Sequence, residues 1–232
     1  MSHHSYAPAG TPAAGSCFLA KDSWSALTHF IGFLYSIFLT PLLLVHASQN
    51  QASSSVLTSL SVFMLSMALL FGASTAYHTL LVAPRTERLL KKLDHSMIYV
   101  LIAGSYTPIC TALLPTGKGT VLLAAVWGVA LLGIVFKLCW VTCPKWVSSV
   151  IYIAMGWSCL AVLPDLLSIL SPAAFGLLLL GGLFYTFGGV LYALRLKRFN
   201  ARCPNFGSHE VFHVAVMLGS LCHYFFMFLY IR

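Results

Sequence analysis

Three histidines, His78, His209 and His213, have the spacing expected of metal ligands. His209 and His213 are four residues apart, so a helix would turn both imidazoles toward one point. His78 closes an apolar run and follows Ser74 by the same interval. Neutral imidazole is a common zinc ligand, and three protein ligands leave one position for water. We therefore expect these three histidines to hold a zinc ion.

Two further side chains could act on a water molecule held by such an ion. Asp94 opens the next apolar run, and a carboxylate at that place can take a proton from the water as a general base. Ser74 would lie one helical turn from His78, where it would help to hold the water or a substrate carbonyl. Asp94 would also suit a helix cap, and capping is compatible with the catalytic role.

A second interpretation of the same region stays open. The segment from His209 to His213 matches the H-E-x-x-H motif, in which the glutamate is the general base of a metalloprotease. Glu210 would equally suit the first turn of a helix, where the helix dipole stabilises a negative charge. His29 and His95 are interpreted either as hydrogen-bonded residues at helix ends or as partners of the ligands.

The elements that carry these residues are predicted to cross a membrane. Of the 232 residues, 59% are hydrophobic and 8% are charged, whereas a soluble domain has about 25% charged residues. Lipid leaves only helices and closed barrels, and the apolar runs are too long for barrel strands. We expect an all-α membrane protein of seven transmembrane helices, at residues 24–45, 56–81, 96–114, 120–138, 147–163, 173–194 and 211–231.

The distribution of lysine and arginine predicts the orientation of these helices. If the helices alternate in direction, eleven basic residues fall on the side of the N-terminus and only Lys118 and Arg232 fall on the other. Because basic residues favour the cytoplasmic side, we expect a cytoplasmic N-terminus and an outside C-terminus. The net charge of +8 then reflects topology and contact with anionic headgroups of membrane lipid, so nucleic acid is not an expected partner.

Under this topology the polar residues gather in one layer of the membrane. His78 lies near the cytoplasmic end of the second helix, Asp94 opens the third, and His209 precedes the seventh. Ser25 and His29 repeat the four-residue spacing at the same depth in the first helix. Since the topology was inferred from lysine and arginine alone, this agreement supports the metal site independently.

The predicted domain organisation is simple. Residues 1–22 are expected to be a disordered cytosolic tail, because they are small and polar and lack the basic and apolar regions of a signal peptide. Residues 23–232 are expected to form one seven-helix transmembrane domain. Seven scattered cysteines argue against a disulfide framework. The sequence gives no indication of the oligomeric state.

Four segments together resemble the hemolysin III family, within the progestin and adipoQ receptor superfamily. They are Ser25-Ala-Leu-Thr-His29-Phe-Ile-Gly32, Ser74-Thr-Ala-Tyr-His78, Leu93-Asp94-His95-Ser-Met-Ile-Tyr99 with the following Ala103 to Pro108, and Gly207-Ser-His209-Glu-Val-Phe-His213. The resemblance implies a seven-helix fold and zinc on the three histidines. It also implies that Asp94 and Ser74 attend the water. The superfamily is similar to alkaline ceramidases, which are membrane amide hydrolases with a like site.

The expected function is that of a multi-pass zinc protein of the cell membrane. We expect it to hydrolyse an amide or ester bond of a lipid that enters from the bilayer. A non-enzymatic sensor or regulator with structural zinc, a pore-forming hemolysin and an H-E-x-x-H intramembrane protease are the alternatives. The polar residues gather in one layer and do not line a channel, so the sequence by itself gives no support for a pore.

Overall fold

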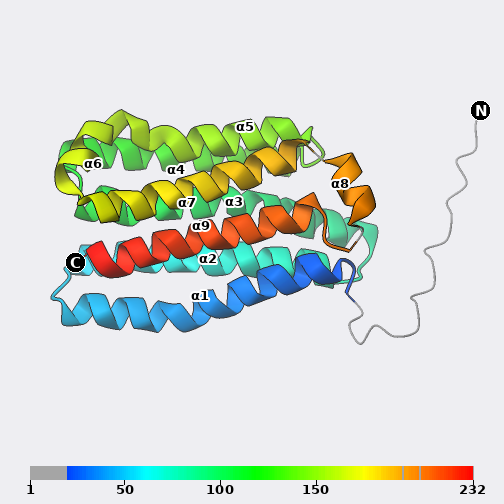
Figure 1. Ribbon diagram of the computed structural model, residues 1–232, viewed down its shortest axis with the longest axis horizontal. Coiled ribbons are helices and arrows are strands. Elements are labelled where there is room, and N and C mark those ends of the chain that lie inside the picture. The colour runs from blue at the N-terminus through cyan, green and yellow to red at the C-terminus, as the bar shows by residue number, and fades with distance from the viewer. Residues whose placement is uncertain (1–19, 195, 204, 232) are drawn as a thin grey trace, which may run out of the picture.

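The computed structural model describes residues 20–194, 196–203 and 205–231, and every regular element among them is a helix. The predicted tail 1–22 falls mostly outside these residues. The longer helices lie side by side along the long axis of the molecule (Figure 1). They are α1 (Ser23–Gln49), α2 (Ser54–Thr79), α3 (Pro84–Ala112), α4 (Thr116–Cys139), α5 (Lys145–Gly156), α7 (Pro172–Leu194) and α9 (Ser208–Tyr230).

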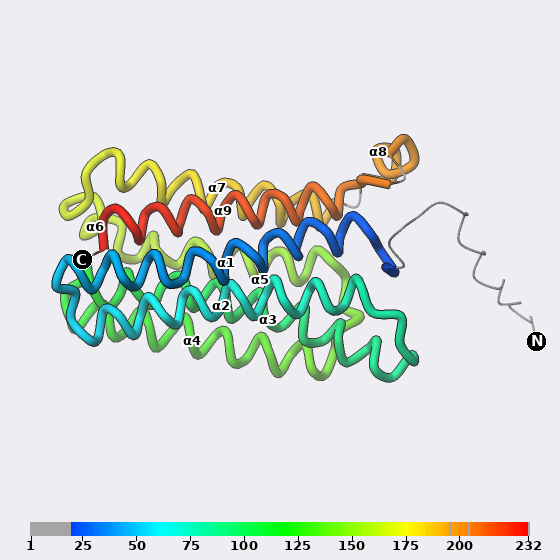
Figure 2. Tube along the Cα trace, turned by 90° about the horizontal axis from the view of Figure 1, so that it is seen from below, coloured from blue at the N-terminus to red at the C-terminus, as the bar shows by residue number. Residues whose placement is uncertain are grey.

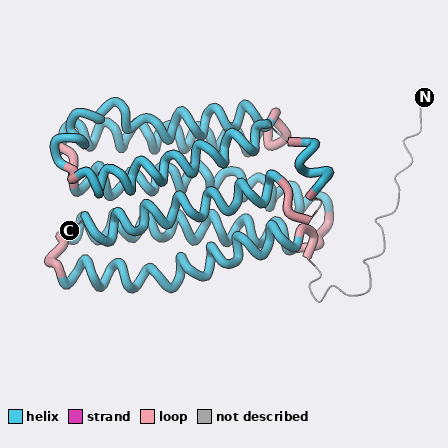
Figure 3. Tube along the Cα trace, in the orientation of Figure 1, coloured by secondary structure: helices cyan, strands magenta, loops and turns pink. Residues whose placement is uncertain are grey.

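Helices that follow one another in the chain are mostly neighbours in space. Helix α2 packs between α1 and α3, and α3 packs against α4. Helix α9 closes the bundle, because it contacts both α1 and α7, while α5 lies against α7 (Figure 2). The connections lie at the two ends of the bundle (Figure 3). The short helix α8 (Lys197–Arg202) lies at the end where α1 and α9 begin.

Six helical segments among the described residues are long and apolar enough to cross a membrane. They are α1, α2, α4, the segment from Lys145 to Ile169, α7 and α9. Large apolar side chains cover the outside of the bundle; Phe38 is 68% exposed and Leu132 is 71% exposed. The predicted all-α membrane class is therefore confirmed, and the chain is a multi-pass membrane protein.

Helix α3 begins well before the apolar run that predicted it. The prediction placed its start at residue 96, whereas the helix begins at Pro84. Proline suits the first helical position because its missing N–H would have no partner there. The added turns carry Arg85, Glu87 and Arg88, and such charges hide a helix from a search for apolar residues.

The predicted fifth helix is interrupted. Helix α5 ends at Gly156 and is followed by a 3₁₀ turn (Trp157–Val162) and the short α6 (Leu163–Ile169). Tyr106 of α3 satisfies the interrupted backbone, because its hydroxyl donates to the Gly156 carbonyl at 2.5 Å and accepts from the Cys159 N–H at 2.9 Å. In lipid, a break in a helix needs such internal partners.

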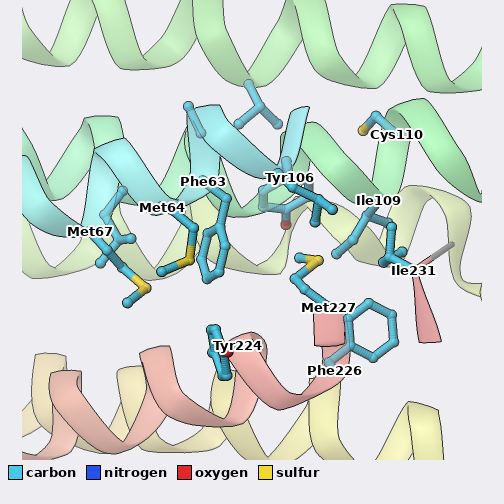
Figure 4. Packing of buried hydrophobic residues seen from close by; sticks show 14 of the residues in the cluster. Phe63, Met64, Met67, Tyr106, Ile109, Cys110, Tyr224, Phe226, Met227 and Ile231 are labelled. Atoms are coloured by element: carbon cyan, nitrogen blue, oxygen red, sulfur yellow. The ribbon is translucent and has the colours of Figure 1, made fainter. Parts of the chain in front are cut away.

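One layer of the bundle interior is rich in aromatic and methionine side chains. Phe63, Met64 and Met67 of α2 face the part of α9 that carries Tyr224 and Met227 (Figure 4). These five side chains are almost fully buried. Methionine adapts to irregular gaps between helices, so this layer joins α2 and α9 beyond the polar end of the bundle.

Candidate metal centre

The three predicted ligands meet at one end of the bundle. His78 lies in the last turn of α2, while His209 and His213 occupy the first two turns of α9. One nitrogen from each ring lies within 4.8 Å of the nitrogens from the other two. His78 and His213 are buried and His209 is partly buried. The structure therefore brings together residues that are 131 positions apart in the chain.

The distance between two of the nitrogens fits a zinc ion. The Nε2 atoms of His78 and His209 are 3.4 Å apart. Two imidazole nitrogens at the usual zinc distance and a tetrahedral angle would be about 3.3 Å apart. Ionisable side chains inside a membrane bundle are also costly unless their polar atoms have partners. The donor set and its spacing thus suit zinc.

The hydrogen bonds of His78 leave its inner nitrogen free to bind a metal. Its Nδ1 lies 3.0 Å from Oδ2 of Asp22, and an ionised carboxylate can only accept. Nδ1 must therefore carry the hydrogen, which leaves a lone pair on Nε2. The same hydrogen bond holds the pKa of the Asp22 carboxyl below its ordinary value.

His213 is oriented in the same way by Thr28 of α1. Its Nδ1 lies 3.2 Å from the Thr28 hydroxyl, which in turn lies 3.0 Å from the carbonyls of Trp24 and Ser25. Because the hydroxyl gives its hydrogen to one of these carbonyls, it accepts from His213 Nδ1, and the lone pair falls on Nε2. The His213 ring stacks face to face on the His29 ring, and the two ring centroids are 3.6 Å apart.

Asp94 and Ser74 are both buried near this cluster. Asp94 is 8% exposed, and its Oδ2 lies 3.2 Å from Nδ1 of His95. The Ser74 hydroxyl has no hydrogen-bond partner among the described residues, although it lies close to Asp94. Asp94 is not one of the three residues that converge.

His95 is placed as a partner of Asp94. Its Nδ1 also lies 2.9 Å from the Lys91 carbonyl, and its Nε2 lies 3.1 Å from the Tyr192 hydroxyl. Both ring nitrogens are therefore engaged. His29 is buried against His213 and Phe71, and neither of its nitrogens has a partner among the described residues.

Glu210 caps the start of α9. One carboxylate oxygen accepts from the Ser25 hydroxyl at 2.6 Å, and the other accepts from the Gly207 N–H at 2.8 Å. This is the arrangement expected of an acidic residue in a first helical turn. Each oxygen accepts a hydrogen bond from a group at the start of a helix, so the geometry favours the helix-cap interpretation over that of a protease general base.

An apolar cavity leads away from the cluster into the bundle. Its volume is about 320 Å³, and it is bounded by α3, α5, α7 and α9. His29, Asp94, His209 and His213 line it at the polar end, and most of the remaining lining is apolar. A polar site at the head of an apolar cavity is the usual form of a small-molecule site.

Two residues of this centre, Asp22 and Thr28, were not singled out by the sequence. Both lie at the start of α1, and their partners are 56 and 185 positions away. Asp22 falls within the predicted tail 1–22, although it directly precedes α1. No periodicity or spacing connects such distant residues, so only the packing of α1 against α2 and α9 reveals them.

The fold and the site together define the class of this protein. It is a multi-pass membrane protein with a candidate metal centre at one end of its helical bundle. Residues 19–224 match the family described as "Haemolysin-III related", and the chain belongs to that family, as the resemblance predicted.

Two bacterial relatives are similar over nearly their whole length. The chain is 35% identical over 214 residues to Hemolysin-3 of Bacillus cereus, and the matched residues cover 92% of this chain and 93% of that protein. It is 37% identical over 212 residues to a Hemolysin-3 homolog of Bacillus subtilis (strain 168), covering 91% and 95%. A more distant relative is progestin and adipoQ receptor-like protein 1 of Caenorhabditis elegans, 27% identical over 239 residues that cover 92% of this chain and 54% of that protein.

Proposed function

We propose that this chain is a zinc-dependent hydrolase of the cell membrane that cleaves an amide or ester bond of a lipid. The observation that carries the proposal is the convergence of three histidine nitrogens beside a buried carboxylate, at the head of an apolar cavity. The chain of a lipid would fill the cavity, which would place its polar linkage near the histidines. A lipid could enter such a cavity from the bilayer.

The roles of the residues follow from their surroundings. His78, His209 and His213 would hold the ion, with Asp22 and Thr28 fixing two of the rings. When bound, zinc supplies a Lewis acid and lowers the pKa of water to about 7. Asp94 would accept a proton, and its contact with His95 would keep the carboxylate in place. The unpaired Ser74 hydroxyl would hold the water or the substrate carbonyl.

The proposal includes seven membrane-spanning helices with a cytoplasmic N-terminus. Helix α3 would cross the membrane in addition to the six segments named above. It has 29 residues, packs between α2 and α4, and has an apolar second half. Basic residues from Lys21, the start of α3, the end of α4, the start of α5 and α8 lie at the end of the bundle that carries the histidines. That distribution supports a cytoplasmic position of the metal centre.

The hydrolase proposal is tested by Asp94→Ala. We expect the variant to keep its zinc and to lose turnover by about 10²-fold or more, because a positioned general base contributes at least that much. Turnover would be measured in mixed micelles with a fluorescent ceramide and a fluorescent diacylglycerol as probes. Asp165→Ala is the matched control, because Asp165 pairs with Lys118 on the opposite side of the predicted membrane.

Zinc-bound wild type without turnover of any lipid amide or ester would contradict the hydrolase and favour a regulator with structural zinc. A second candidate is membrane lysis, which is favoured by the name hemolysin of the two bacterial relatives. Lysis through a pore would survive replacement of all three histidines in a folded protein.

A further inference from the structure

Asp22 is joined to His78 through both its backbone and its side chain. The Asp22 N–H donates to the His78 carbonyl at 3.0 Å, and the Asp22 carboxylate accepts from His78 Nδ1 at 3.0 Å. The His78 side chain is only 4% exposed, whereas that of Asp22 is 48% exposed. The carboxylate thus lies on the outer side of the centre, and the imidazole separates it from the other two rings.

The position of His78 in its helix explains why it needs a partner. The last four carbonyls of a helix have no intrahelical donor, and His78 is the penultimate residue of α2. The Asp22 N–H satisfies this carbonyl and brings the carboxylate to the ring of the same residue. The hydrogen bond from Nδ1 to the Asp22 carboxylate also determines the tautomer of the buried ring.

We propose that Asp22 is a positioning residue of the metal centre, which fixes the tautomer and orientation of His78 so that Nε2 faces the other two ligands. Carboxylates that accept from the outer nitrogen of a ligating histidine have this effect, and their loss costs about 10–100-fold in metal affinity. The inference rests on the metal centre of the proposed function and is independent of hydrolysis.

A simpler role must be separated from this one. Lys21, the preceding residue, pairs with Glu87 of α3 at 2.7 Å, and its ammonium lies 4.0 Å from the centre of the Tyr77 ring. These contacts also hold the start of α1 against α2 and α3. Asp22 could therefore act only as one of several anchors. Glu87→Gln provides the matched control, because it removes the charge of an ion pair that anchors the same segment without touching His78.

The experiment measures zinc affinity by chelator competition in detergent micelles, together with the melting temperature of the metal-free protein. We expect Asp22→Ala to weaken zinc binding by about 10–100-fold and Asp22→Glu to restore part of it. Glu87→Gln should bind zinc as wild type does. If Asp22→Ala is poorly folded, Asp22→Asn keeps the shape of the side chain and should still bind zinc more weakly than wild type.

Three results would overturn the proposal. In the first, the Asp22 variants bind zinc as tightly as wild type. In the second, Glu87→Gln weakens binding as much as Asp22→Ala does, so that anchoring alone explains the contact. In the third, folded wild type binds no zinc, and then the metal centre itself fails, whereas the first two results leave it intact.

Discussion

Hydrogen-bond partners distinguish the roles of three histidines at the polar end of the bundle, His78, His213 and His95. His78 and His213 each direct one nitrogen to an acceptor on the outer side, which leaves the other nitrogen for the centre. His95 has both nitrogens engaged and serves Asp94. Residue type alone does not distinguish these roles, because all three lie in apolar helices near the same end.

Glu210→Gln separates a helix cap from a protease base. Glutamine cannot accept both hydrogen bonds of Glu210, so we expect the free energy of unfolding to fall by about 1 kcal/mol. Zinc content and lipid turnover should stay near wild type. Thermal unfolding, metal analysis and the micelle assay would measure the three quantities. Loss of all turnover with zinc retained would instead show that Glu210 acts in the chemistry.

The convergence of His78, His209 and His213 was predictable at this scale, and the partners of these side chains were not. The four-residue spacing of His209 and His213 places both on one helical face, and the depth of His78 matches theirs. Asp22 and Thr28 depend on contacts between helices that are distant in sequence. Local patterns contain no information on such contacts.

At the scale of the helices, the apolar runs predicted where each lies in the chain but not where it ends. Charged residues at the start of α3 continue the helix beyond the apolar run. The break after α5 depends on Tyr106, a residue of another helix. Hydropathy reports the lipid-facing part of a helix, whereas its ends are decided by caps and neighbours.

Close packing between helices is tested by two glycines of α4. A methyl group at Gly119 would overlap the backbone carbonyl oxygen of Cys110 in α3, whereas one at Gly128 would meet nothing within 4 Å. We expect Gly119→Ala to lower the free energy of unfolding by about 1–3 kcal/mol, as overpacking does. Gly128→Ala should be neutral or raise it by roughly 0.5–1 kcal/mol, because alanine favours a helix. Equal melting temperatures for the two variants would contradict the packing of α3 on α4.

At the scale of the whole molecule, the bundle joins the start of α1, the end of α2 and the start of α9 at one end. Because neighbouring helices run antiparallel, the end of one helix lies beside the start of the next at the same end of the bundle. The family and the helical class were predictable from the sequence, because motifs and apolar runs are local features of the chain. The cavity was not, since its walls come from α3, α5, α7 and α9 together.

The orientation of the molecule is tested by labelling single cysteines with a membrane-impermeant maleimide. One protein would keep only the exposed native Cys139, at the end of α4. The other would carry only Ser171→Cys, in the connection between α6 and α7. With a cytoplasmic N-terminus, intact cells should label position 171 alone, and Cys139 should react only after lysis. The opposite pattern would place the metal centre outside.

The most direct test of the metal centre is the zinc content of the purified protein. Wild type should contain about one zinc per chain, held by three histidines as in other zinc sites. The triple variant His78→Ala, His209→Ala and His213→Ala should contain none, while His46→Ala, which changes a histidine stacked on Phe228 near the other end, should keep the metal. Folded wild type without zinc, or a triple variant that retains it, would contradict the account.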